Sequence, residues 1–163
     1  MQGNGHLRRS AELAVERHEA FGELLNRQEK SRLVDHGVVR STVPGEFLCR
    51  PHQIDTRSYL LAVGEVEVRD RAEMKSTVLA RLGWSGLFGE IAALFCLPRI
   101  SAIRVSQPSV LLAISGDTLE KVISGRAELY DAVWFSVISS ASRIPHYAVS
   151  RCFVMLRQTG WSH

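Results

Sequence analysis

The sequence predicts a mainly β domain with helices before and after it, and two observations support this prediction. Between residues 38 and 114, short apolar runs with a period of two alternate with turn residues about every ten positions, as in a β-barrel or β-sandwich. On both sides of this region the apolar residues follow the period of a helix. A chain of 163 residues can bury one hydrophobic core, so we expect one β unit flanked by helices.

Residues 1–37 are expected to form the N-terminal helices. The apolar residues of segment 10–25 recur at helical spacing and predict one helix there: Leu13, Ala14, Phe21, Leu24 and Leu25. Asn26 and Glu29 then stand in the pattern of a capping box, in which each side chain satisfies the other residue's backbone N–H. A second helix is therefore predicted to begin at this pair and to end near residue 36.

Residues 38–116 hold the predicted strands. They cover residues 38–43, 47–49, 59–63, 66–69, 77–82, 101–105 and 110–114. Segment 59–63 is apolar almost throughout and ends at Gly64, whereas Val66 and Val68 alternate with charged residues as in a half-buried strand. The charged residues 70–76 are expected to form the loop of a β-hairpin.

Residues 117–163 are predicted to be helical again. One helix is expected over residues 117–124, with its N-terminal cap at residues 117–120. A longer helix follows over residues 127–143, and after Pro145 a last amphipathic segment covers residues 147–156. The long helix carries an apolar stripe that would cover a pocket or contact another copy of the chain: Tyr130, Val133, Trp134 and Val137.

Composition excludes several function classes. The net charge is only +3 and the longest basic run is Arg8-Arg9, so the basic surface of a nucleic-acid-binding protein is missing. Three cysteines and six histidines are dispersed without metal-ligand spacing, which predicts no metal site and small, buried, reduced thiols. The polar N-terminus and the lack of an apolar run of ~20 residues predict a cytoplasmic protein that does not enter a membrane.

Segment 82–105 carries the residues from which chemistry can be inferred. Glycines at 83, 86 and 89 surround an apolar helical turn between two predicted strands. A helix that begins near Gly89 and Glu90 presents free backbone N–H groups to an anion. Arg99 follows at the start of the next predicted strand, where its guanidinium can bind a phosphate through two hydrogen bonds. Together these features predict a pocket for a sugar phosphate.

The run Phe88-Gly89-Glu90-Ile91-Ala92, followed by Pro98-Arg99, resembles the phosphate-binding cassette of cyclic-nucleotide-binding domains, which here would cover residues 86–101. Similar segments upstream are residues 44–46, 59–61 and 64–66, so that the likeness spans roughly residues 21–138. It is closest to the regulatory subunits of cAMP-dependent protein kinase, and catabolite-activator-type sensor domains are similar too. The resemblance implies a β-roll or jelly roll (a double-stranded β-helix) that binds cAMP or cGMP and catalyses no reaction.

The resemblance also implies a role for each residue of the cassette. Arg99 would pair with the exocyclic phosphate oxygens, and Glu90 would accept a hydrogen bond from the ribose 2′-OH. The other ligand-binding candidates are backbone donors and their neighbours: Gly89, Ile91, Ala92, Ile100 and Ser101. Phe88 is a candidate for the pocket wall or the core, as are Leu79 and Ile103.

Two alternatives remain open from the residues alone. Arg99 would otherwise be an exposed strand arginine that pairs with Glu90 across an empty pocket. Glu90 would otherwise only cap the short helix at its N-terminus.

The chain departs from the family pattern at two places. Ile100 stands where the family usually has a small or hydroxylated residue, which leaves only a backbone donor there and favours cAMP over cGMP. The loss of one hydrogen bond to a charged group costs about 1.5–3 kcal/mol, so weak binding is possible. Pro51-His52-Gln53 replaces a glycine–acid turn, and this loop is expected to lie away from the cassette as a local variation.

The base contact and the signalling partner are expected in the C-terminal helices. By its distance along the chain, Val137 would close over the purine, with Trp134 one helical turn earlier. Ligand binding would then reorient these helices toward an effector protein or a second copy.

Three other functions are consistent with parts of the sequence. The chain could be a degenerate domain that serves as an interaction scaffold, although Glu90 and Arg99 are both present. It could be the sensor fragment of a catabolite-activator-type transcription factor, but only about twenty residues follow Arg143, so it should not bind DNA as given. An enzyme of the double-stranded β-helix type needs a His/carboxylate metal site that the sequence lacks.

Overall fold

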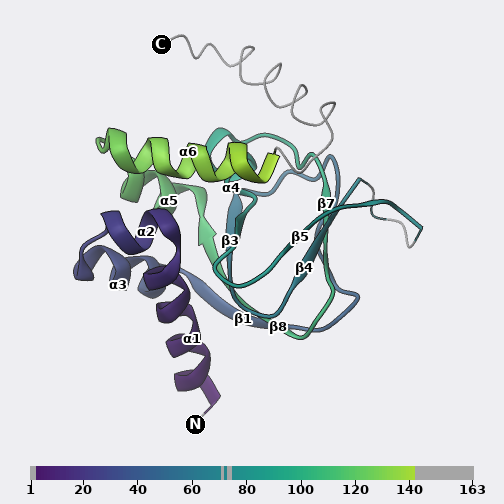
Figure 1. The fold of residues 1–163 in the computed structure, drawn as a ribbon, viewed down its shortest axis with the longest axis horizontal. Coiled ribbons are helices and arrows are strands. Elements are labelled where there is room, and N and C mark those ends of the chain that lie inside the picture. Colours follow the sequence, from purple (N-terminus) through teal and green to yellow (C-terminus); the bar gives the residue numbers. More distant parts are fainter. Residues whose placement is uncertain (1–2, 71, 73–74, 142–163) are drawn as a thin grey trace.

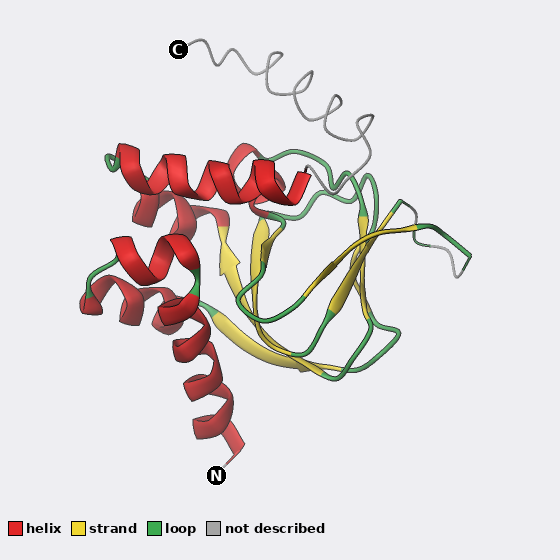
Figure 2. Ribbon diagram, viewed as in Figure 1, coloured by secondary structure: helices red, strands yellow, loops and turns green. Residues whose placement is uncertain are grey.

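The computed structural model describes residues 3–70, 72 and 75–141. Two four-stranded antiparallel sheets form the β unit, with all described helices gathered at one side and one end of it (Figures 1 and 2). The prediction of a mainly β fold with flanking helices is confirmed, and the two facing sheets form the β-roll that the resemblance implied.

The first sheet has the strand order β1-β8-β3-β6 and the second has the order β2-β7-β4-β5. The strands of the first sheet are β1 (Val38–Thr42), β8 (Ser109–Ser115), β3 (Arg57–Val63) and β6 (Leu87–Phe88). The strands of the second sheet are β2 (Phe47–Cys49), β7 (Ala102–Val105), β4 (Val66–Arg69) and β5 (Val78–Leu82). Strand β6 was not predicted, because a strand of two residues leaves no periodic pattern in the sequence.

Strand β3 explains why segment 59–63 is apolar almost throughout. Tyr59 and Leu61 point into the core between the two sheets, whereas Leu60 points into a second core under the helices. Because both faces of β3 are covered, the strand has no solvent side and no polar alternation. The helices pack on this first sheet, mainly through α1 and its contacts with β1, β3 and β8.

The N-terminal region contains three helices: α1 (Gly3–Arg17), α2 (Glu19–Leu24) and α3 (Arg27–His36). The prediction of one helix over residues 10–25 is wrong, because the helix is interrupted at His18. The His18 side chain accepts a hydrogen bond from the backbone N–H of Phe21, at 3.3 Å, and so caps α2. The capping box of Asn26 and Glu29 is confirmed at the start of α3.

The C-terminal region contains α5 (Gly116–Ile123) and α6 (Ala127–Ala141). The cap of α5 is Ser115, whose side chain accepts a hydrogen bond from the Thr118 N–H. The predicted cap at residues 117–120 is therefore placed too late. The predicted end of the long helix at residue 143 and the segment 147–156 lie outside the described residues.

Cys49 is buried as expected, but Cys96 is exposed, because it ends a short helix at the surface with a φ of 52°. In the part of the chain that the structure describes, no helix is long and apolar enough to span a membrane. The same part contains no group of His, Cys, Asp and Glu side chains that could hold a metal ion.

Candidate functional site

The cassette, residues 86–101, leads from strand β6 through α4 (Glu90–Phe95) toward β7. Gly89 precedes α4 in the left-handed region, with a φ of 80°. A Cβ at this position would lie 2.3 Å from Nη1 of Arg99 and 3.2 Å from the carbonyl oxygen of Arg57. Glycine is therefore required here both for its backbone conformation and for the close approach of the arginine.

Arg99 is buried, with 4% of its surface exposed. Its Nη1 donates to the Gly89 carbonyl at 2.9 Å, and its Nη2 donates to the Arg57 carbonyl. The same Nη2 lies 3.3 Å from Oδ2 of Asp55, while Nε has no hydrogen-bond partner among the described residues. Arg99 is thus neither an exposed arginine nor the ion-pair partner of Glu90, and that alternative is wrong.

The backbone of Arg99 is held by the loop that was expected to lie away from the cassette. The Arg99 N–H donates to the Gln53 carbonyl at 2.8 Å, and the His52 N–H donates to the Arg99 carbonyl at 2.8 Å. His52 adopts a φ of 65° in this loop. The expectation is therefore wrong: the loop forms two backbone hydrogen bonds to the cassette at its central arginine. Arg99 itself precedes β7, which begins at Ala102, and does not lie within the strand.

Glu90 is buried at the N-terminus of α4, with 8% of its surface exposed. Its Oε2 has no hydrogen-bond partner among the described residues. Burial raises the pKa of this carboxyl to about 7, although its own backbone N–H and the charge of Arg99 both act to lower it. The site thus contains a carboxyl group that is protonated about as often as ionised at neutral pH.

A cavity of about 140 Å³ opens between the cassette and the second sheet. Every residue of the predicted ligand-binding set lines it: Gly89, Glu90, Ile91, Ala92, Arg99, Ile100 and Ser101. The opposite wall is apolar and comes from strands β4, β5, β6 and β7: Val68, Ala80, Leu82, Leu87 and Ile103. Phe88 also lines the cavity, whereas Leu79 packs on the core between the sheets.

The predicted contacts with the base fall on α6. Trp134 and Val137 belong to this helix, but their side chains lie outside the described part of the structure. Other residues of the stripe do lie near the cassette: Tyr130 and Val133 line a small cavity together with Glu90, Ile91 and Leu94. Helix α4 therefore stands between the cavity on one side and α6 on the other.

Sequence reasoning missed Asp55. Its side chain is 6% exposed and pairs with Arg99, while Nε of Arg57 donates to its Oδ1 at 3.0 Å. Burial raises the pKa of Asp55, but the hydrogen bonds from Arg57 and the charge of Arg99 outweigh it and leave the pKa below its usual value. The only signal in the sequence is that two charged residues precede an apolar strand, which does not identify a partner for Arg99.

Sequence reasoning also missed Cys49. Its thiol lines the cavity and lies 3.7 Å from the Ser101 carbonyl. Burial raises the pKa of this thiol, so it stays protonated and serves as a small apolar wall residue.

Residues 39–126 match the cyclic nucleotide-binding domain family. The match covers more than half of the chain and includes the whole cassette, so the chain belongs to this family.

A cGMP-dependent protein kinase from Eimeria tenella is 28% identical over 103 residues, which are 63% of this chain and 10% of that protein. The chain thus spans about a tenth of the length of this relative.

Solved structures share the fold at low identity. The regulatory domain of Toxoplasma gondii PKA with cAMP has a TM-score of 0.63 and 17% identity, over 75% of this chain and 46% of that chain. A cyclic nucleotide-binding domain from Methylobacillus flagellatus KT has a TM-score of 0.64 and 16% identity, over 99% of this chain and 88% of that one. The N-terminal domain of a transcriptional regulator from Streptomyces coelicolor A3(2) has a TM-score of 0.60 and 21% identity, over 80% and 93% of the two chains. These structures therefore show that the chain shares the fold of cyclic nucleotide-binding domains.

Proposed function

We propose that this chain is a cytoplasmic sensor that binds cAMP in preference to cGMP and catalyses no reaction. The observation that carries the proposal is that Arg99 and Glu90 are both buried, line the same cavity, and each have a polar atom without a hydrogen-bond partner among the described residues. Buried polar groups are almost always hydrogen-bonded, and exceptions call for a missing partner. A cyclic nucleotide supplies both partners, because its phosphate is an acceptor for the guanidinium and its ribose 2′-OH is a donor for the carboxylate.

The N-terminus of α4 would hold the phosphate together with Arg99. Gly89, Ile91 and Ala92 supply backbone N–H groups at the first turn of this short helix, beside the guanidinium. On binding, the phosphate would compete with the Gly89 and Arg57 carbonyls for the donors of Arg99. The Asp55 carboxylate would keep the guanidinium oriented during this exchange.

The preference for cAMP rests on the wall of the cavity. Val68, Ala80, Leu82 and Ile103 offer no polar side-chain atom, and Ile100 offers no hydroxyl. Both bases carry an exocyclic amine, but guanine adds a carbonyl oxygen, which would lose water against such a wall without a replacement hydrogen bond. Because an unpaired buried polar group costs about 1–3 kcal/mol, adenine should bind better.

Signalling would pass through α4. Ile91 and Leu94 contact the small cavity that Tyr130 and Val133 of α6 close from the other side. A nucleotide that pulls the N-terminus of α4 toward its phosphate would change this contact and so favour a different position of α6. The equilibrium between the two positions would shift by the difference in the nucleotide's affinity for them. An effector protein or a second copy of the chain would respond to this movement.

Calorimetric titration with cAMP and cGMP tests the proposal. We expect binding of cAMP that Arg99→Ala weakens at least a hundredfold, since the loss removes a charge-assisted pair. Arg32→Ala is the matched control, because Arg32 is an exposed arginine of α3. If neither nucleotide gives heat or raises the melting temperature, the scaffold hypothesis replaces the sensor.

A further inference from the structure

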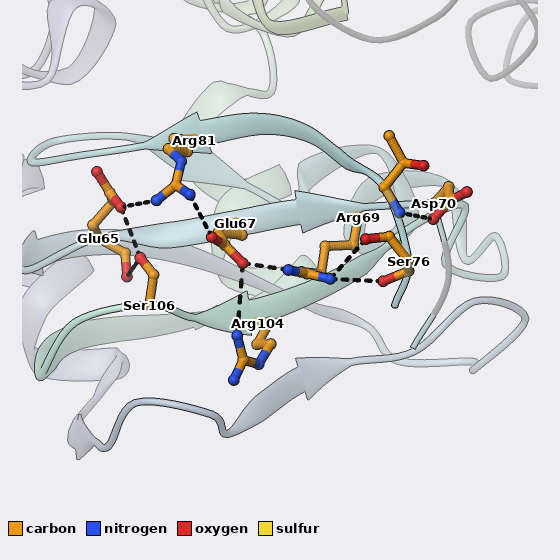
Figure 3. Close-up of polar contacts among 9 residues, drawn as sticks. Glu65, Glu67, Arg69, Asp70, Ser76, Arg81, Arg104 and Ser106 are labelled. Carbon is orange, nitrogen blue, oxygen red and sulfur yellow. Dashed lines mark hydrogen bonds and ion pairs between the residues drawn. The ribbon is translucent and has the colours of Figure 1, made fainter. Parts of the chain in front are cut away.

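The outer face of the second sheet carries a network of charged side chains that is separate from the nucleotide cavity (Figure 3). At its centre, the Glu67 carboxylate is 6% exposed, although the described helices lie at the other sheet and at one end of the roll. Nε of Arg69 donates to Glu67 at 2.9 Å, and Nη2 of Arg81 lies 2.8 Å from its other oxygen. Glu67 is buried by the arginines themselves.

Arg104 lies at the edge of this network and makes only one long contact with it. It lies on β7 between Ile103 and Val105, which point into the core between the sheets, so its side chain points outward. Its closest carboxylate contact is 3.8 Å, from Nη1 to Glu67, and its Nε is buried without a hydrogen-bond partner in the described chain. The Arg104 side chain is 26% exposed and its contact with Glu67 is long, so the exposed part of its guanidinium can bind a second anion.

A second guanidinium and an aromatic ring stand beside Arg104. Phe47 of β2 is its cross-strand partner and is partly exposed on the same face. The Arg50 guanidinium lies 4.6 Å from the centre of the Phe47 ring. Within the described residues, this ring contact is the only side-chain interaction of Arg50, and no carboxylate pairs with it. We name this cluster of Phe47, Arg50 and Arg104 the arginine face.

The surroundings of the arginine face restrict what can bind to it. Glu46, which pairs with Arg40, adjoins Phe47, and Glu65, which pairs with Arg81, lies at the other end of the network. These carboxylates limit the basic surface to a small cluster, whereas a nucleic acid or an anionic membrane needs an extended basic surface. Arg50, which has no carboxylate partner among the described residues, and Arg104, whose contact with Glu67 is long, instead lie around one aromatic ring, and together they fit two carboxylates around one apolar side chain.

We propose that the arginine face binds an acidic segment of a partner protein, in which Asp or Glu side chains flank an apolar residue. The two guanidiniums donate paired hydrogen bonds to the carboxylates, and the apolar residue packs on the Phe47 ring. This inference does not depend on the identity of the nucleotide, because it rests on the opposite side of the sheet from the cavity.

The test uses the whole chain and a fluorescein-labelled peptide, Glu-Leu-Glu-Glu-Leu-Glu, followed by fluorescence anisotropy at low salt. Arg50→Ala and Arg104→Ala should each weaken binding about tenfold, because each removes a charge-assisted contact. Arg32→Ala, on α3, should leave binding unchanged. Since Arg104 is partly buried, Arg104→Lys and the melting temperature of each variant show whether a loss of binding comes from unfolding.

Changes in the backbone amide chemical shifts of the protein on addition of the peptide, measured by NMR, show where the peptide binds. Changes centred on Phe47, Arg50 and Arg104 would support the proposal. It would be overturned by equal peptide binding to the wild type and to both alanine variants. Shifts confined to other surfaces, or a preference for phosphatidylserine vesicles or a short single-stranded RNA over the peptide, would overturn it as well.

Discussion

Glu90 should make nucleotide binding depend on pH. Its pKa in the empty site is about 7, while the bound state needs the ionised carboxylate to accept a hydrogen bond from the ribose 2′-OH. Binding therefore releases a proton wherever Glu90 starts out protonated. The apparent Kd should rise as the pH falls below 7, to about tenfold above its pH 8 value at pH 6 and about a hundredfold at pH 5.

The assay is calorimetric titration with cAMP from pH 5 to pH 8.5, in buffers of different ionisation enthalpy. At pH 7, about half a proton should be released per nucleotide bound. Glu90→Gln keeps an acceptor oxygen but cannot titrate. At pH 8 its Kd should therefore be higher than that of the wild type, and it should be nearly constant with pH. With 2′-deoxy-cAMP the wild type should likewise lose most of its pH dependence. A constant Kd for wild type and cAMP over this range would refute the reasoning, since Glu90 would then not change its charge on binding.

Four further results are expected. Gly89→Ala should lower stability by about 1–3 kcal/mol in chemical denaturation and weaken cAMP binding, because the new methyl group would meet Arg99 and the φ of 80° is unfavourable for alanine. Asp55→Ala should cost the ligand-free chain about 3 kcal/mol, because it leaves Arg99 buried without its carboxylate, and cAMP should then raise the melting temperature by more than it does in the wild type. Glu90→Gln should raise the melting temperature of the ligand-free chain at pH 8, because the raised pKa of Glu90 means that its ionised form destabilises the fold, and a variant that melts lower would contradict this. Burial lowers the pKa of His18 to about 4, so stability should fall as the pH drops from 6.5 to 4, and His18→Gln should flatten that part of the stability curve.

That the residues of segment 86–101 meet at one cavity could be predicted, because the information is local. Gly89, Glu90 and Arg99 lie within eleven residues of one another, and each residue type fits one need of a phosphate site. The cavity also contains the whole predicted ligand-binding set. Those contacts follow from spacing along a single segment.

The partners of Arg99 could not be predicted because they come from far along the chain. Asp55 and the Arg57 carbonyl lie more than forty residues before Arg99 and reach it only through the pairing of the strands. The loop at His52 was misplaced for the same reason. The break at His18 and the cap at Ser115 depend on single side-chain hydrogen bonds, which compete with helical periodicity and leave no periodic pattern of their own.

Strand β3 belongs to two cores at once, and this has a consequence for how the molecule opens. Leu60 packs with the helices and Leu61 packs in the core between the sheets, so a displacement of β3 disrupts both cores. The backbone amides of β3 should accordingly be among the slowest to exchange with deuterium. A nucleotide that binds at the cassette and holds β3 in its sheet should then also slow exchange at those amides of the N-terminal helices that open only together with β3.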